Sequence, residues 1–343
     1  MCKKREKIID LLKGIAIFLV VYSHAIQYFS GEEYLIKKCF FDNMVFKVIY
    51  SFHMPLFMLI SGYLFFNYND KKIDIKKQLK TLIIPIFSWQ FLYSLIYFIN
   101  KEKNISYFKF LSSSIIYGLW FLWAIFYISC FIIFLEYFVK NKKLKILIHI
   151  LNFFILMLIP DYFGSSLYKF MYPFFIIGYY NKNLEKLKTI QNNTKQYKVI
   201  QLVMLLIYLI LLVKYESNFY IYTSGYYIFN KEIFYFNQIY INIYRFIIGL
   251  IGSLLIIFFV NLFNSVKNKN NLKLLEILGK NSLGIYILTG YGFEFISKKI
   301  ESSGLNYFYD FLVSCILIII SLIIIKLIKK VKILNILLLG GRK

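Results

Sequence analysis

Residues 312–327 read LVSCILIIISLIIIKL, and residues 202–213 read LVMLLIYLILLV. With their flanks such runs reach about 20 apolar residues, which as helices are long enough to cross a bilayer. The 343-residue chain is 59% hydrophobic and only 17% charged, well below the charge of soluble domains. Its net charge is +24, yet the lysines lie between the apolar runs instead of along amphipathic faces. This arrangement indicates a membrane protein and sets aside nucleic-acid binding, collagen-like structure, a disulfide scaffold and disorder.

Apolar runs recur along the whole chain, and they predict an all-α, polytopic integral membrane protein without a soluble domain. Each span must be helical, because backbone groups in lipid have no water to bond. We expect a bundle of ten transmembrane helices, at about residues 8–29, 46–67, 81–99, 115–139, 144–160, 167–180, 199–215, 240–263, 274–296 and 307–327.

The distribution of basic residues predicts the orientation of these spans. Of the 41 Lys and Arg, 27 lie at the two ends, in alternate loops or at the span edges beside them, and 11 lie in the other loops or at their span edges. Three, Lys13, Arg245 and Lys280, lie deeper within spans. Basic residues accumulate on the cytoplasmic side of membrane proteins. We therefore expect a multi-pass protein of the plasma (inner) membrane with both termini in the cytoplasm.

The first expected span carries three ionisable residues, Asp10, Lys13 and His24. At 100° per residue Lys13 and His24 are nearly eclipsed and about 16 Å apart along the helix. Lys13 then lies near the cytoplasmic side and His24 near the outer side. An interfacial Asp10–Lys13 ion pair and a packing role for His24 are the structural alternatives. Ionisable residues inside spans are nevertheless functional candidates by default.

The second span runs in the opposite direction and brings His53 to a depth similar to that of His24. Trp120 at the start of the fourth span and Arg245 in the eighth are expected at the same outer level. These four residues predict a polar pocket open to the outside, although Trp120 is also typical of an interface anchor and Arg245 of a snorkelling side chain. Ser61, followed by glycine, suits close helix packing and is also a candidate for substrate binding.

The pattern of polar residues narrows the chemistry. The four cysteines are far apart, no acidic cluster suggests a metal site, and no known nucleophile or nucleotide motif is present. The strongest candidate is an imidazole acting as a general base on a hydroxyl.

Several motifs resemble the membrane-bound acyltransferase 3 family, in its fucose 4-O-acetylase-like branch. Asp10, Lys13-Gly14 and His24 are similar to the family's first-helix signature, in which a basic residue precedes a histidine by eleven positions. Thr289 departs from the family, which often has histidine there. Further similar stretches are Phe52-His53-Met54-Pro55-Leu56-Phe57 with Ser61-Gly62, Lys80 with Pro85, Leu119-Trp120-Phe121-Leu122, and Leu278-Gly279-Lys280-Asn281-Ser282-Leu283 with Tyr286.

The resemblance implies that residues 1–343 form one membrane acyltransferase domain. It implies transfer of an acyl group, usually acetyl, from cytoplasmic acyl-CoA to a hydroxyl of a cell-surface or lipid-linked polysaccharide. Acetyl-CoA would be a donor substrate, with no permanently bound cofactor, and membrane lipids would surround the protein. Asp10 and Lys13 would serve the donor side, His24 would be the base, and His53, Trp120 or Arg245 would stabilise the oxyanion.

Two other classes of protein share the long apolar runs. A transporter or flippase of lipid-linked glycans would be expected to show paired repeats and broken helices in both halves, which this sequence lacks. A glycan polymerase would be expected to carry a large outer loop, and the longest expected outer segment covers only residues 216–239.

Replacing Lys13 with alanine tests the expected donor-side role of this residue. We expect Lys13→Ala to raise the apparent KM for acyl-CoA more than the apparent KM for the acceptor, because the lysine lies near the cytoplasmic side. Steady-state kinetics in membranes with each substrate varied in turn measure both constants. Equal losses on the two substrates would contradict this assignment.

Overall fold

The computed structural model describes residues 7–29, 39–68, 75–100, 106–181, 195–230, 233–265, 272–297 and 307–341. Helices dominate these residues. The two strands are short and form one antiparallel pair, in which Phe229 lies opposite Phe234. This architecture confirms the all-α membrane fold predicted from the sequence. The helices of the first half are α1 (Lys7–Phe29), α2 (Met44–Tyr68), α3 (Ile75–Gln78), α4 (Ile84–Asn100), α5 (Tyr107–Tyr117), α6 (Trp120–Phe138), α7 (Lys142–Leu158) and α8 (Ser165–Tyr180), with short helical segments η1 (Cys39–Asp42) and η2 (Leu79–Ile83).

The second half continues the bundle. Its elements are α9 (Lys195–Val213), η5 (Ser217–Phe219), α10 (Ile221–Ser224), β1 (Phe229–Asn230), β2 (Ile233–Phe234), α11 (Phe236–Ser265), α12 (Lys273–Lys280), α13 (Ser282–Ser297), α14 (Tyr307–Lys330) and α15 (Lys332–Leu339). Six helical stretches are long and apolar enough to cross a membrane: Lys7–Phe29, Met44–Phe65, Ile75–Ile99, Trp120–Phe138, Phe236–Asn261 and Tyr307–Lys330. That all ten expected segments cross the bilayer stays a prediction.

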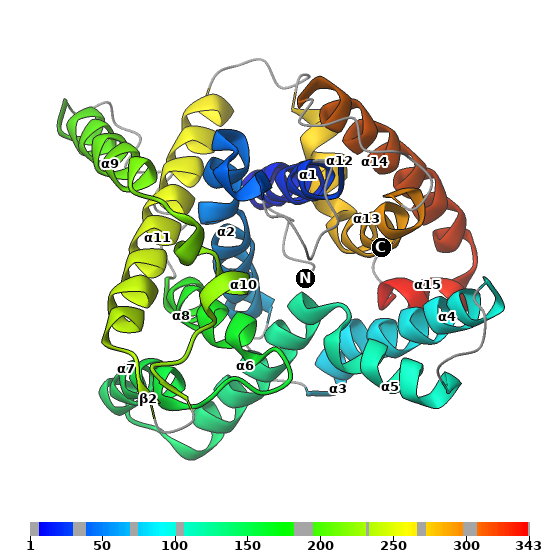
Figure 1. Ribbon diagram of the computed structural model, residues 1–343, viewed down its shortest axis with the longest axis horizontal. Coiled ribbons are helices and arrows are strands. Elements are labelled where there is room, and N and C mark those ends of the chain that lie inside the picture. Colours follow the sequence, from blue (N-terminus) through cyan, green and yellow to red (C-terminus); the bar gives the residue numbers. More distant parts are fainter. Residues whose placement is uncertain are drawn as a thin grey trace.

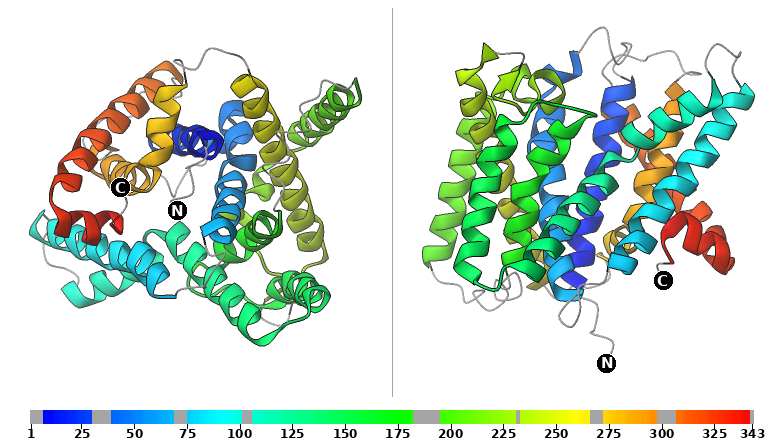
Figure 2. Two further views of the ribbon diagram at one scale, coloured as in Figure 1. Left: turned by 180° about the vertical axis from the view of Figure 1, so that it is seen from behind. Right: turned by 90° about the horizontal axis from the view of Figure 1, so that it is seen from below.

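Helices α1 and α2 lie side by side in the middle of the bundle (Figure 1). Helix α1 also contacts α12, α13 and α14, whereas α2 contacts α8 and α11. Seen from the side, most of the long helices run roughly parallel to one another, and the start of α1 lies at the same end as α15 (Figure 2). The strand pair lies at the opposite end. The side chains of α1 and α2 are therefore mostly enclosed by other helices.

The outer helices expose apolar side chains. Leu202, Leu206 and Ile210 on α9 are each at least half exposed, and so are Ile319 and Ile323 on α14. Apolar surface on this scale is unfavourable against water but matches the hydrocarbon of a bilayer. These faces are consistent with lipid around the bundle.

Two expected spans are interrupted in the structure. The span predicted at 115–139 breaks at Gly118 and Leu119, so that α5 ends there and α6 begins at Trp120. Leu119 has φ of 49°, a left-handed conformation, and a side chain on Gly118 would collide with Gln90. The span predicted at 274–296 breaks at residue 281, between α12 and α13. Helix α15 follows the last expected span and was not predicted.

Glycines hold the central helices in backbone contact. A Cβ atom at Gly62 of α2 would lie 2.0 Å from the carbonyl oxygen of Phe175 in α8, and one at Gly178 would lie 2.0 Å from that of Leu59. Helix α1 meets α12 in the same way, because Cβ atoms at Gly14 and Gly279 would lie 2.0 and 1.8 Å from carbonyl oxygens of the facing helix. Small residues permit this close approach, as expected for the residues around Ser61.

Replacing Gly62 with alanine tests the contact between α2 and α8. The added methyl group would overlap backbone, which cannot move aside like a flexible side chain. We expect Gly62→Ala to lower the free energy of unfolding by about 1–3 kcal/mol, the usual cost of overpacking. The loss is read as a lower melting temperature of the detergent-purified protein. Gly290→Ala is the matched control, because a Cβ there meets nothing within 4 Å, and equal melting temperatures of the two variants would refute the contact.

Candidate functional site

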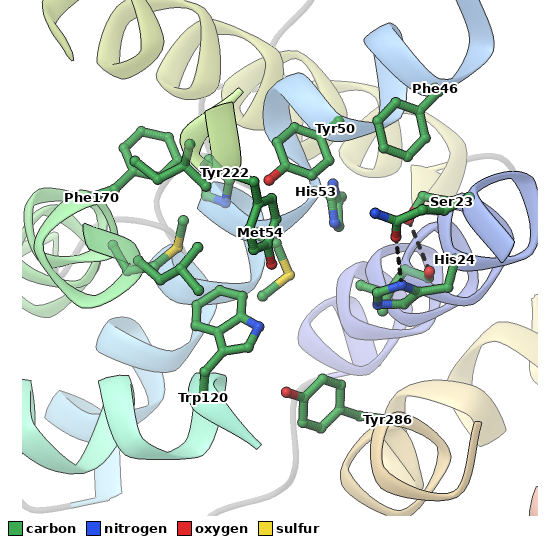
Figure 3. A pocket seen from close by; sticks show the side chains of 16 residues that line it. Ser23, His24, Phe46, Tyr50, His53, Met54, Trp120, Phe170, Tyr222 and Tyr286 are labelled. Carbon is green, nitrogen blue, oxygen red and sulfur yellow. Dashed lines mark hydrogen bonds between the residues drawn. The ribbon is translucent and has the colours of Figure 1, made fainter. Parts of the chain in front are cut away.

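A cavity lies between the central helices (Figure 3). Its lining includes Ile221 and Tyr222 of α10, in the half of the bundle that also contains the strand pair (Figure 2). Its volume of about 40 Å³ exceeds the roughly 10–15 Å³ needed for one water molecule. Side chains from α1, α2, α6, α8, α10 and α13 contribute to its wall. The polar or aromatic residues of the lining are Ser23, His24, Gln27, Phe46, Tyr50, His53, Trp120, Phe170, Tyr222 and Tyr286.

His24 projects from α1 into this cavity and is half-buried. Its Nδ1 atom lies 3.2 Å from Oε1 of Gln27, one turn farther along the same helix. The rings of Tyr28 and Phe293 lie beside the imidazole, with centroids 6.4 and 6.3 Å from it. The hydrogen bond turns Nδ1 toward Gln27 and leaves Nε2 as the nitrogen available to a ligand.

His53 reaches the same cavity from α2 and is only 4% exposed. Its Nδ1 atom lies 2.8 Å from the carbonyl oxygen of Ile49. A carbonyl oxygen only accepts hydrogen bonds, so Nδ1 carries the proton and donates it to Ile49. In the neutral ring Nε2 is then an acceptor. His53 therefore offers the cavity a lone pair and not an N–H group.

Trp120 forms another wall of the cavity as the first residue of α6. The break at Gly118 and Leu119 determines its position, because it directs α6 away from α5. In Figure 3 the indole nitrogen of Trp120 and the hydroxyl of Tyr286 face the space beside His24. Helices α6 and α13 thus contribute an indole N–H group and a hydroxyl group to the cavity that His24 lines.

Arg245 does not line the cavity, although it was expected there. Arg245 is 2% exposed, and its guanidinium hydrogen-bonds to the segment of residues 218–225. Nε donates to the carbonyl oxygen of Phe219 at 2.8 Å, and the other two nitrogens bond to the carbonyl oxygens of Asn218, Tyr220 and Gly225, to Oδ1 of Asn242 and to Oγ of Ser224. This segment carries Ile221 and Tyr222, which line the cavity, so Arg245 supports the wall from behind.

The remaining predicted site residues lie elsewhere. Asp10 is 3% exposed near the first turn of α1, where its carbonyl oxygen packs against Gly279. Lys13 is half-buried one turn farther on. The hydroxyl of Ser61 donates to the carbonyl oxygen of Phe57 in its own helix, at 2.8 Å. Of the four residues expected in the outer pocket, the cavity brings together His24, His53 and Trp120.

Apart from Tyr286, which stands in a stretch similar to the family, sequence reasoning did not single out the other polar residues of the cavity. Gln27 could have been identified from the sequence, because it follows His24 by three residues and residues three apart share a helix face. Tyr50 precedes His53 by three residues and could have been identified in the same way. Tyr222 could not be placed, because its position depends on the segment that Arg245 holds in place.

The cavity combines hydrogen-bond acceptors with aromatic walls. No Asp, Glu, Lys or Arg belongs to its lining among the residues that the structure describes. Within the same residues, no group of three or more His, Cys, Asp or Glu is placed to hold a metal ion. Imidazoles beside aromatic side chains, in a described lining without charged acids or bases, suit an uncharged ligand with hydroxyl groups.

The sequence matches a family model described as an acyltransferase domain over residues 6–328. It is 32% identical over 185 residues to nodulation protein NolL of Mesorhizobium japonicum, across 51% of this chain and 47% of that protein. It is 30% identical over 195 residues to nodulation protein NolL of Sinorhizobium fredii, across 51% of this chain and 48% of that protein. The chain thus spans about half the length of the curated relatives it matches. No solved structure matches it significantly.

Replacing Arg245 with lysine tests its support of residues 218–225. A single ammonium group cannot reach the carbonyl oxygens that the planar guanidinium bonds simultaneously. We expect Arg245→Lys to increase amide hydrogen exchange of this segment at least 10-fold while the exchange of α1 stays unchanged. Hydrogen-exchange mass spectrometry in detergent micelles measures both. Unchanged exchange of residues 218–225 would show that the segment holds its position without Arg245.

Proposed function

We propose that this chain, which belongs to the acyltransferase 3 family, is a membrane-bound O-acyltransferase. An acyl group, in the first instance acetyl, moves from acyl-CoA to a hydroxyl of a cell-surface or lipid-linked polysaccharide. The observation that carries the proposal is the pair of imidazoles, His24 and His53, which line one cavity with Nδ1 of each ring already hydrogen-bonded to an oxygen. Two nitrogen lone pairs at one cavity suit the capture of a hydroxyl proton.

His24 is the better candidate for the general base. It is half-buried at the cavity, whereas His53 is almost fully enclosed, so His24 is the more accessible to a substrate. The resemblance of the first helix to the family signature also falls on His24. His53 would accept a hydrogen bond from the acceptor and orient it. The two histidines would thus act at one hydroxyl or at two neighbouring hydroxyls.

The reaction has a simple proton balance. His24 Nε2 takes the proton of the acceptor hydroxyl while the hydroxyl oxygen forms a bond to the thioester carbonyl carbon of acyl-CoA. The tetrahedral oxyanion then collapses and the carbon–sulfur bond breaks. The imidazolium of His24 returns the proton to the departing thiolate, so the products are an ester and CoA with a free thiol. His24 ends each turnover in its starting state.

Trp120 is the best placed oxyanion donor of the three residues expected in that role. His53 offers an acceptor nitrogen as long as the ring is neutral, and Arg245 is committed to residues 218–225. The Trp120 indole lies on the cavity wall, with its N–H group toward His24 (Figure 3). A donor fixed at the developing negative charge stabilises the transition state more than the ground state.

The walls of the cavity support a carbohydrate acceptor. Sugars present apolar ring faces and polar edges, and sites for such ligands combine aromatic side chains with a few oriented polar groups. Tyr50, Trp120, Tyr222 and Tyr286 supply aromatic surface around the two imidazoles. The neutral lining is compatible with a hydroxyl-bearing glycan.

The donor would enter from the opposite end of the bundle. The start of α1, with Asp10 and Lys13, lies at the end that also holds α15 (Figure 2). The excess of basic residues in the loops at this end supports a cytoplasmic location for it, where acyl-CoA is available. In this arrangement the protein spans the plasma (inner) membrane with both termini in the cytoplasm, and the acceptor binds on the outer side.

Replacing His24 with alanine tests the proposed chemistry. We expect His24→Ala to lower acetyl transfer at least 100-fold, because a general base contributes about 10²–10⁴-fold to rate. His149→Gln is the matched control: this third histidine bonds the hydroxyl of Tyr172 at 2.6 Å and does not line the cavity. Both variants are compared with the native protein for expression in the membrane and for acetylation of the cell-surface glycan.

Deleting the gene separates the competing functions. Loss of one acetyl group per repeat unit, detected by mass spectrometry of the glycan from cells that lack the gene, supports the acyltransferase. Loss of the whole polymer supports a transporter, a flippase or a polymerase. Undiminished acetylation by a well-expressed His24→Ala protein would remove His24 from the mechanism.

A further inference from the structure

We infer that Gln27 is a positioning residue that holds His24 in the tautomer and orientation required for proton abstraction. The inference rests on the proposed function, because it concerns the imidazole to which that function assigns the proton transfer. Gln27 Oε1 lies 3.2 Å from His24 Nδ1, and Gln27 is itself 5% exposed. The pair lies on one face of α1, three residues apart, so the helix itself fixes the spacing.

The bond decides which ring nitrogen faces the substrate. An amide oxygen only accepts, so Nδ1 of His24 must carry the proton and donate it to Gln27. The neutral ring then has its lone pair on Nε2. Without this bond the proton exchanges between the two nitrogens, and in the other tautomer Nε2 cannot act as a base.

His53 shows the same arrangement by a different route. Its Nδ1 is held by the backbone carbonyl of Ile49, which no substitution can remove. Both imidazoles therefore have Nδ1 bonded to an oxygen, while they reach the cavity from α1 and α2. Of these two histidines, only His24 has Nδ1 bonded to a side-chain oxygen, so the effect of that oxygen can be tested by mutation.

The neutral amide also matters because, among the residues that the structure describes, no carboxylate lines the cavity beside His24. The titratable groups that share the cavity with it are His53 and Tyr50 of α2, Tyr222 of α10 and Tyr286 of α13, with Tyr28 on the same helix. None of these is a carboxylate. Gln27 orients the imidazole without adding negative charge, whereas a glutamate at this position would also stabilise the imidazolium.

Two substitutions separate orientation from charge. Gln27→Leu keeps the approximate volume and removes the acceptor oxygen. Gln27→Glu keeps acceptor oxygens, has no N–H group and introduces a charge. Glutamate can maintain the bond only if Nδ1 of His24 is the donor, so this variant tests the assigned tautomer directly. Gln201→Leu and Gln201→Glu are matched controls, because Gln201 lies on α9, away from the cavity.

Kinetics in membranes containing the native acceptor give the first readout. We expect Gln27→Leu to lower kcat for acetyl-CoA by about 10–100-fold, the range seen when the partner that orients a histidine is lost. The apparent KM for acetyl-CoA should stay within about two-fold, and Gln27→Glu should restore most of kcat at high pH. A loss of kcat in Gln27→Glu equal to that of Gln27→Leu, or an unchanged kcat in Gln27→Leu, would overturn the inference.

Chemical modification gives a second readout that does not require activity. Diethyl pyrocarbonate modifies the neutral imidazole, and mass spectrometry of the peptide that contains His24 reports its extent at each pH. We expect Gln27→Glu to move the midpoint of this profile upward by about 1 pH unit or more, the usual effect of an adjacent opposite charge, with no movement in Gln201→Glu. A midpoint unchanged in Gln27→Glu would contradict the contact.

The two readouts distinguish the inference from the proposed function. If the native protein transfers no acetyl group, the proposed function fails, while the modification profile still tests the contact of Gln27 with His24. If the native protein is active and the Gln27 variants change neither kcat nor the modification profile, the inference fails while the proposed function stands.

Discussion

Backbone contact between glycine-bearing helices is the constraint on which the site depends. Gly62 and Gly178 bring α2 against α8, and Gly14 and Gly279 bring α1 against α12. Lipid offers no hydrophobic force between helices, so close packing of this kind has to fix their positions. With α1 and α2 held in this way at the centre of the bundle, their histidines face the same cavity. The geometry of the cavity therefore depends on packing that extends to the opposite end of the bundle.

The wall of the cavity depends on a second, electrostatic interaction, between the Arg245 guanidinium and backbone carbonyl groups. Residues 217–224 form two short helical segments, and a short segment of this kind leaves backbone carbonyl groups without partners. The buried guanidinium of Arg245 satisfies several of them at once, and its planar shape suits several acceptors in a fixed arrangement. A charge inside a membrane protein is costly, and here carbonyl dipoles on several sides compensate for it. The result is a fixed wall that places Tyr222 in the cavity lining, with its ring 6.1 Å from that of Tyr50.

The sequence predicted those features that follow from helical periodicity and depth. His24 and His53 could be placed together by counting residues along antiparallel spans, and the same counting placed Trp120. It failed for Arg245, because depth alone cannot tell whether a side chain points into a cavity or beneath a loop. It also missed the break before α6, which depends on the left-handed conformation of Leu119 and on the contact of Gly118 with Gln90. Such features arise from tertiary contacts that no local pattern contains.

Geometry along α1 constrains how donor and acceptor could meet in the proposed reaction. Gly14 faces α12, and Lys13 precedes it, so Lys13 points about 100° away from that contact. His24 lies eleven residues beyond Lys13 and within about 20° of the same direction. The tight contact with α12 therefore occupies a different side of α1 from the line that joins Lys13 to His24. A thioester arm that follows this line passes along α1 for about 16 Å and ends at the nitrogen that Gln27 leaves free. In the proposed reaction, one helix would align Lys13, on the proposed donor side, with His24 as the proposed base.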